Sequence, residues 1–190
     1  MWAMTLWENG NPVVQWTVII TAAAVAAATD LASRRIPNWL TIPVFLAGVV
    51  WATSIGGLLG LTDSLVACII LMLPYVLLYA FARGGAGDAK LMGAMGAWLG
   101  LVNGLAALTA VAIMGILGAI IYSIMKGRGK ELAGNLSVFG QGTAVAVITR
   151  SGMGPAFNGM SSRTSLTMPY GVAIFAGVCV AGMGVYLWRT

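Results

Sequence analysis

The sequence predicts an all-α integral membrane protein, a bundle of about six transmembrane helices with both termini on the outside. The composition is the first reason: of 190 residues, 59% are hydrophobic and 8% charged, whereas a soluble domain has ~25% charged residues. The mean hydropathy is +0.93. The apolar runs are of helix length and do not alternate strictly with polar residues, which favours helices over a β-barrel. We expect one integral membrane domain over residues 1–190.

Each predicted span is an apolar run close to the ~20 residues that cross a bilayer. The runs are residues 13–29, 39–61, 64–82, 88–101, 105–125 and 168–188. The first can extend past Asp30 toward Arg35, and Pro37 ends it, because the residue before a proline is disfavoured in helical geometry. Pro74 is read as a tolerated kink in the third run.

Glycines and polar residues separate the later runs. The stretch from Arg83 to Gly87 breaks the third run from the fourth, and Asn103-Gly104 is read as a turn before the fifth. A polar segment rich in Gly, Ser and Thr occupies about residues 126–167. Its apolar part, residues 136–148, is interpreted as interfacial or re-entrant, and the segment as a cytoplasmic loop.

The cations set the orientation, because cytoplasmic loops carry an excess of Lys and Arg. With the N-terminus outside, only Arg189 of the ten cations is outside. The inside segments hold Arg34, Arg35, Arg83, Lys90, Lys126, Arg128, Lys130, Arg150 and Arg163. The net charge of +5 is therefore a topology signal, with attraction to anionic membrane lipid second. No nucleic-acid partner is expected, since no aromatic and basic module accompanies the charge.

The residue types exclude several kinds of chemistry. Histidine is absent, which removes Ser-His-Asp triads, histidine general bases and nearly all zinc sites. Cys68 and Cys179 lie far apart inside apolar runs and are expected to be small buried hydrophobes. We therefore expect no metal and no cofactor.

Two of the five acidic residues stand out. Glu8, Asp63 and Glu131 fall in segments where a solvated structural role is expected. Asp30 lies near the inner end of the first span and Asp88 opens the fourth, so both carboxylates return to the same boundary. Ionisable groups at membrane depth are costly and are candidates for function.

Two carboxylates at one level suggest acid–base chemistry. Like charges a few ångströms apart share one proton, so one member can activate water while the other polarises a carbonyl. Structural readings stay open beside this one. Asp30 and Arg34 are four residues apart and could form an ion pair, and Asp88 could be a helix N-cap. A proton- or cation-coupled transporter using the same two aspartates, and a structural membrane subunit, are the alternative functions.

Short motifs surround both acids. The pattern Asp-x-x-x-Arg-x-Ile-Pro-Asn is formed by Asp30, Arg34, Ile36, Pro37 and Asn38. Residues 85–90 read Gly-Ala-Gly-Asp-Ala-Lys, and residues 169–173 read Pro-Tyr-Gly-Val-Ala. In this order, the three motifs resemble those of the prepilin peptidases, polytopic aspartyl proteases with a Gly-x-Gly-Asp element. The resemblance covers nearly the whole chain.

The resemblance implies that Asp30 and Asp88 are the catalytic pair of an aspartyl endopeptidase in the cell's inner membrane. The expected partner is a pilin-like precursor of the type IV or Flp kind, which loses its short leader at the cytoplasmic face. Larger members carry an N-terminal region with paired Cys-x-x-Cys motifs and a methyltransferase activity. These are not carried over, because the sequence has no such cysteines and begins almost directly with its first predicted span. The short forms of bacterial tight-adherence systems are preferred over archaeal preflagellin peptidases.

The other motif residues have expected roles in shaping the cleft or binding the substrate. Pro37 and Asn38 are expected to make the turn between two helices, and Lys90 to point away from the acids, about 200° round an ideal helix from Asp88. The full set of candidates beside the two aspartates is Gly85, Gly87, Lys90, Arg34, Pro37, Asn38, Pro169, Tyr170 and Gly171.

Overall fold

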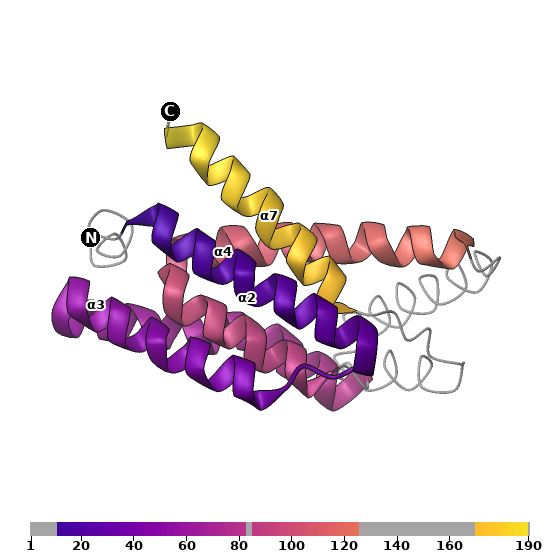
Figure 1. The fold of residues 1–190 in the computed structure, drawn as a ribbon, viewed down its shortest axis with the longest axis horizontal. Coiled ribbons are helices and arrows are strands. Elements are labelled where there is room, and N and C mark those ends of the chain that lie inside the picture. Colours follow the sequence, from indigo (N-terminus) through magenta and orange to yellow (C-terminus); the bar gives the residue numbers. More distant parts are fainter. Residues whose placement is uncertain (1–10, 83–84, 126–169, 190) are drawn as a thin grey trace, which may run out of the picture.

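The computed structural model describes residues 11–82, 85–125 and 170–189, and almost all of these residues are helical (Figure 1). The helices are α2 (Pro12–Ser33), α3 (Asn38–Ala82), α4 (Ala86–Met125) and α7 (Tyr170–Arg189). The predicted all-α class is confirmed. The predicted loop over residues 126–167, its apolar part and Pro169 lie outside the described residues.

The helices have the dimensions and surface of membrane helices. All four of those described are long and apolar enough to cross a bilayer. Their outer faces carry large apolar side chains in the open, such as Leu58 at 79% and Met125 at 80% exposure. A soluble protein rarely exposes contiguous apolar surface of this kind, so the chain is a multi-pass membrane protein.

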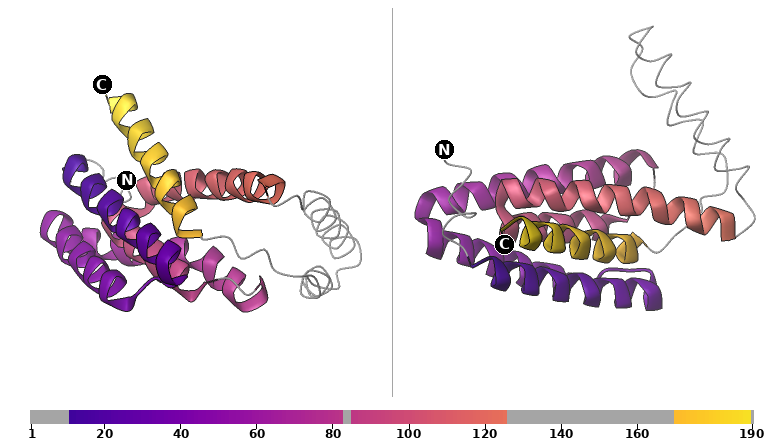
Figure 2. Two further views of the ribbon diagram at one scale, coloured as in Figure 1. Left: turned by 45° about the vertical axis from the view of Figure 1, so that its right-hand side comes forward. Right: turned by 90° about the horizontal axis from the view of Figure 1, so that it is seen from above.

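Both α3 and α4 consist of two helical segments joined at one glycine. Gly57 has φ 56° and ψ −137°, and Gly100 has φ 68° and ψ −175°. The ribbon turns back on itself at both points (Figures 1 and 2). A positive φ is strained for residues with a Cβ and readily adopted by glycine. The sequence-based breaks near residues 62–63 and at Asn103-Gly104 are therefore wrong, because these residues are helical.

Asp63 corrects a second expectation. Instead of being solvated it is 2% exposed, and its Oδ1 accepts a hydrogen bond of 3.2 Å from the Leu101 N–H. Leu101 follows the Gly100 bend, where the first N–H groups of a helix lack partners within it. The Ser64 hydroxyl donates to the Ala97 carbonyl across 3.0 Å on the other side of the bend. These two side chains of α3 therefore stabilise the reversal in α4.

Small residues let the helices approach closely. A Cβ on Gly96 of α4 would lie 2.6 Å from the Ala67 carbonyl oxygen of α3. Gly177 of α7 lies in the same way against the Cα of Val111 in α4. Close packing of small residues is the usual way in which helices associate in membranes. α3 thus packs along α4, and α7 crosses α4 and α2.

Replacing Gly96→Ala tests this packing. The added methyl group meets three backbone atoms of Ala67 and Cys68 within 3 Å, so the two helices must separate. We expect a loss of about 1–3 kcal/mol in the free energy of unfolding, typical of overpacking. Thermal unfolding in detergent measures it, and Gly184→Ala, with nothing within 4 Å of the new Cβ, is the matched control. Equal stability of both variants would show that the α3–α4 contact is looser.

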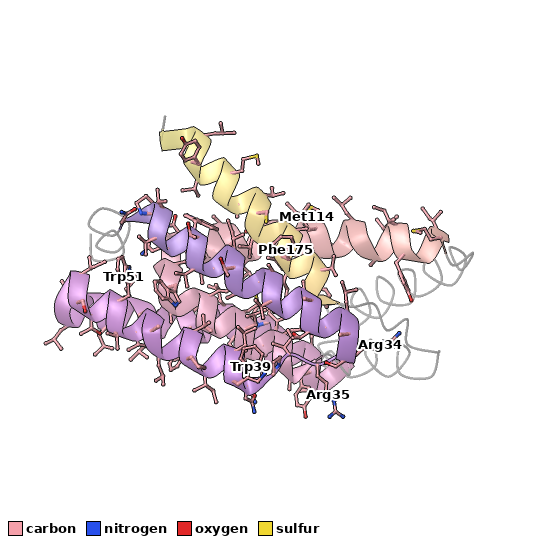
Figure 3. All side chains as sticks on the ribbon, in the orientation of Figure 1. Arg34, Arg35, Trp39, Trp51, Met114 and Phe175 are labelled. Atoms are coloured by element: carbon pink, nitrogen blue, oxygen red, sulfur yellow. The ribbon has the colours of Figure 1, made fainter. Side chains whose placement is uncertain are left out.

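One end of the bundle collects the motif-bearing helix ends. The end of α2 and the starts of α3, α4 and α7 lie at this end, on the right in Figure 1. Arg34, Arg35 and Trp39 mark the same end in Figure 3, whereas Trp51 lies toward the other end. The Gly57 and Gly100 bends are also at the other end. The motif-bearing end is therefore where the candidate site is built.

Candidate active site

Asp30 lies in the last turn of α2. The helix ends at Ser33, and Arg34 caps it in the left-handed conformation, with its N–H donating to the Asp30 carbonyl across 2.8 Å. Pro37 lies in the connection, as expected, whereas Asn38 is the first residue of α3 instead of part of the turn. The Asp30 side chain is 8% exposed, so its carboxylate is held within the protein although the next turn of chain is at the surface.

The start of α7 contacts this carboxylate directly. The Gly171 N–H donates a hydrogen bond of 2.8 Å to Oδ2 of Asp30. A Cβ on Gly171 would lie 2.9 Å from the Asp30 Cβ and 3.0 Å from Oδ2. The residue at position 171 therefore has to be small, and its backbone N–H must not be engaged in a hydrogen bond within the helix. As one of the first residues of α7, Gly171 has an N–H that no preceding turn of the helix satisfies.

Asp88 lies in the first turn of α4. Its carboxylate folds back over Gly85, where a Cβ would meet Oδ2 at 2.7 Å. Asp88 is not the N-cap of α4, because the helix begins two residues earlier at Ala86. The carboxylates of Asp88 and Asp30 are close enough to interact electrostatically. The fold thus brings together two acids that are 58 positions apart in the sequence.

The two motifs are also docked against each other. A Cβ on Gly87 would lie 2.9 Å from the Ile36 Cβ and 3.3 Å from its backbone nitrogen. On the exposed side, Lys90 Nζ donates to Asn38 Oδ1 across 2.9 Å. Gly87 therefore allows a close backbone approach, and the Lys90 ammonium binds the other motif. These contacts fix the start of α4 beside the end of α2.

Two tyrosines also interact with Asp88. Tyr170 is the first residue of α7, and Tyr75 comes from α3. Their hydroxyls share a hydrogen bond, and both side chains interact electrostatically with Asp88. Tyr170 was a candidate from its motif, whereas sequence reasoning missed Tyr75. No local pattern marks Tyr75, which stands in an apolar run, and only the packing of α3 brings it to the site.

The arrangement is suited to acid–base chemistry. Two interacting carboxylates from different helices can share one proton, and such a pair can deprotonate water and polarise a carbonyl. Within residues 11–82, 85–125 and 170–189, no group of three or more His, Cys, Asp or Glu side chains gathers that could hold a metal ion. Of the remaining sequence candidates, Arg34 lies exposed at this end beside Arg35 (Figure 3).

Comparisons with known proteins point to one family of membrane peptidases. The model of the type IV leader peptidase family matches residues 17–123, more than half of the chain. A prepilin leader peptidase/N-methyltransferase of Neisseria gonorrhoeae is 27% identical over 150 residues, covering 74% of this chain and 52% of the relative. One from Pectobacterium carotovorum subsp. carotovorum is 29% identical over 147 residues, covering 74% and 51%. The chain spans about half the length of these relatives. No solved structure matches it significantly.

Proposed function

Because the chain belongs to the type IV leader peptidase family, we propose that it is an aspartyl endopeptidase that removes the leader peptide of pilin-like precursors. The observation that carries the proposal is the electrostatic interaction between Asp30 and Asp88, which lie on helix ends at the same end of the bundle. The relatives' names include an N-methyltransferase activity. The chain covers only about half of each relative, so the proposal is limited to leader cleavage.

In the proposed reaction, the two aspartates share one proton. The ionised carboxylate takes a proton from water, and the resulting hydroxide attacks the scissile peptide carbon. The protonated carboxyl gives its proton to the carbonyl oxygen, so that the tetrahedral intermediate forms without a free oxyanion. The first carboxyl then protonates the leaving amine, the C–N bond breaks, and the second regains a proton from the intermediate. The two acids are the protein groups whose bonding changes in this scheme; the other bonds that form and break belong to water and the peptide.

The substrate is proposed to be a single-span precursor whose helix lies against the bundle in the lipid. Its scissile bond must unwind locally, because a helical peptide has its carbonyls engaged in hydrogen bonds. Two glycines are proposed to help the extended peptide come close to the acids. Gly85 leaves room beside Asp88, and Gly87 leaves room beside Ile36. The remaining motif residues are proposed to line the cleft around the Asp30–Asp88 pair and to hold its walls in place. They are Arg34, Pro37, Asn38, Lys90, Tyr170 and Gly171.

We further propose that the protein acts as one domain with six spans in the inner membrane, N-terminus and C-terminus outside. The bends at Gly57 and Gly100 support this arrangement, because each divides a helix too long for one crossing. A 45-residue helix such as α3 would be about 67 Å long at ~1.5 Å per residue. The cation distribution supports placing the Asp30–Asp88 end at the cytoplasmic face.

A cleavage assay tests the proposed function. Purified protein in detergent or lipid is incubated with a pilin-like precursor, and the shortened form is detected by mass, with the new N-terminus sequenced. The proposal expects cleavage between the basic leader and the apolar helix. Absence of any product, together with proton-coupled uptake by protein-containing liposomes, would instead favour the transporter.

The orientation gives a separate prediction. In a variant whose two native cysteines are replaced by alanine, single cysteines are introduced by Arg35→Cys and Leu58→Cys. Both positions are exposed. Arg35 lies at the motif-bearing end (Figure 3), and Leu58 directly follows the Gly57 bend at the other end. A membrane-impermeant maleimide should label Leu58→Cys in intact spheroplasts and Arg35→Cys only after lysis. The reversed pattern would overturn the proposed topology and leave the chemistry of the site unaffected.

A further inference from the structure

A pair of tyrosines from two helices adjoins Asp88. Tyr75 is 5% exposed, and its ring meets that of Tyr170 edge to face, with centroids 5.9 Å apart and planes at 68°. Their hydroxyls share one hydrogen bond. Each phenol hydroxyl can donate once and accept. Since the shared bond uses one of the two protons, the pair has one O–H left to donate to a third group, and both tyrosines interact electrostatically with Asp88.

The placement of Tyr170 is determined from two sides. Its hydroxyl occupies space that exists because residue 115 of α4 is glycine: a Cβ there would lie 2.6 Å from the hydroxyl oxygen and 3.1 Å from Cζ. On the other side, the neighbouring Gly171 binds the Asp30 carboxylate through its N–H. The first two residues of α7 therefore adjoin the acidic pair: the Gly171 backbone bonds Asp30, and the Tyr170 side chain interacts electrostatically with Asp88.

We propose that the Tyr75–Tyr170 hydroxyl pair is a positioning element that holds the Asp88 carboxyl in the orientation required for proton transfer. The proposal rests on the proposed function. Tyr170 directs its spare O–H to the carboxyl of Asp88, and Tyr75 fixes the rotation of the Tyr170 hydroxyl. Without this donor, the carboxyl can rotate about its Cβ–Cγ bond and spend less time aligned with the scissile carbonyl. Catalytic groups act within a narrow range of productive geometry, which supporting hydrogen bonds maintain.

Phenylalanine variants test the pair, because they remove only the hydroxyls and keep the ring packing. For Tyr170→Phe we expect kcat to fall about 10- to 100-fold, the size of effect seen when a hydrogen-bond partner that orients a site residue is lost, with KM within about two-fold. Tyr75→Phe should lower kcat less. The double variant should be no slower than Tyr170→Phe, because the two hydroxyls act as one unit. The pH profile of kcat should also shift in Tyr170→Phe.

Matched controls are available on the same two helices. Tyr79 of α3 and Tyr186 of α7 are exposed at 56% and 65%, and their change to Phe should leave kcat and the pH profile unaltered. Four Phe variants with wild-type kcat would overturn the proposal. A rise in KM at unchanged kcat for Tyr170→Phe would also overturn it, because it would assign the hydroxyl to substrate binding.

Gly115→Ala approaches the same hydroxyl from outside the site. The methyl group displaces the Tyr170 hydroxyl, so kcat should fall by a similar factor. Made together with Tyr170→Phe, where the clashing oxygen is gone, Gly115→Ala should add less than about a two-fold further loss. Fully additive losses would show that Gly115→Ala acts through packing alone and would contradict the proposal. Wild-type protein in the same assay separates this result from failure of the proposed function, which would abolish cleavage in every sample.

Discussion

Neither Asp30→Asn nor Asp88→Asn should cleave a pilin-like precursor. Both substitutions keep the size of the side chain, and the amide oxygen at position 30 can still accept the Gly171 N–H that now bonds Oδ2 across 2.8 Å. What is lost is a group that can take up and release a proton near neutral pH. We expect the cleavage rate of each variant to fall by about 10³-fold or more, because loss of a general acid or base typically costs ~10²–10⁴-fold. Initial rates of product formation measure it.

Asp63→Asn is the matched control. Asp63 is also a buried aspartate, but it caps the helix after the Gly100 bend through the Leu101 N–H, and this bend lies at the end of the bundle away from the motif-bearing helix ends. Its variant should be less stable to heat, while the rate per folded molecule stays within about two-fold of wild type. Leader cleavage at a wild-type rate by folded Asp30→Asn or Asp88→Asn would refute the catalytic pair.

Gly171→Ala should cause the second largest loss. The new methyl group would lie 2.9 Å from the Asp30 Cβ and 3.3 Å from the Ala27 Cα, so α7 must move away from α2. That movement stretches the hydrogen bond to Oδ2 and displaces Asp30 relative to Asp88. A displacement of about 1 Å at a reacting group can cost ~10²-fold in rate. We expect kcat to fall by about that factor in the precursor-cleavage assay.

The control for this variant lies on the same helix. Gly184→Ala adds a methyl group in open space and should leave kcat unchanged, which separates the contact with Asp30 from a general effect of alanine in α7. Thermal unfolding of both variants accompanies the kinetics. A Gly171→Ala protein that cleaves as fast as Gly184→Ala would show that the α7 start does not position Asp30.

Composition and the length of the apolar runs predicted an all-helical membrane protein correctly, because the length of a membrane helix is set by the thickness of the bilayer. The chain reversals were harder to predict. Thr62-Asp63 and Asn103-Gly104 carry ordinary turn signals, yet both are helical, and the chain bends at Gly57 and Gly100 instead. Turn signals are local, whereas the bend after Leu99 is stabilised by Asp63 and Ser64, more than thirty residues away. A polar residue in an apolar protein can be a buried cap as readily as a solvated loop residue.

The candidate site shows the same division. Counting helix crossings was enough to expect Asp30 and Asp88 at one level, and the structure has both at one end of the bundle, although their catalytic roles remain proposals. The contact of Gly171 with Asp30 was not foreseen, because a backbone donor leaves no side-chain signature. Tyr75 was not foreseen either. It stands in an apolar run of the sequence, and its hydroxyl gains a partner only when folding brings Tyr170 next to it.

The group that donates a hydrogen bond to Asp30 is a backbone N–H, so most amino-acid substitutions cannot remove it. Any replacement at position 171 other than proline keeps the N–H, so an alanine scan reports crowding there rather than the hydrogen bond itself. Exchanging that one amide for an ester by semisynthesis would remove the proton and leave the shape intact. The charge environment of this carboxylate is thus encoded by where a helix begins, provided that the residue at this position is small enough for the helix to come so close.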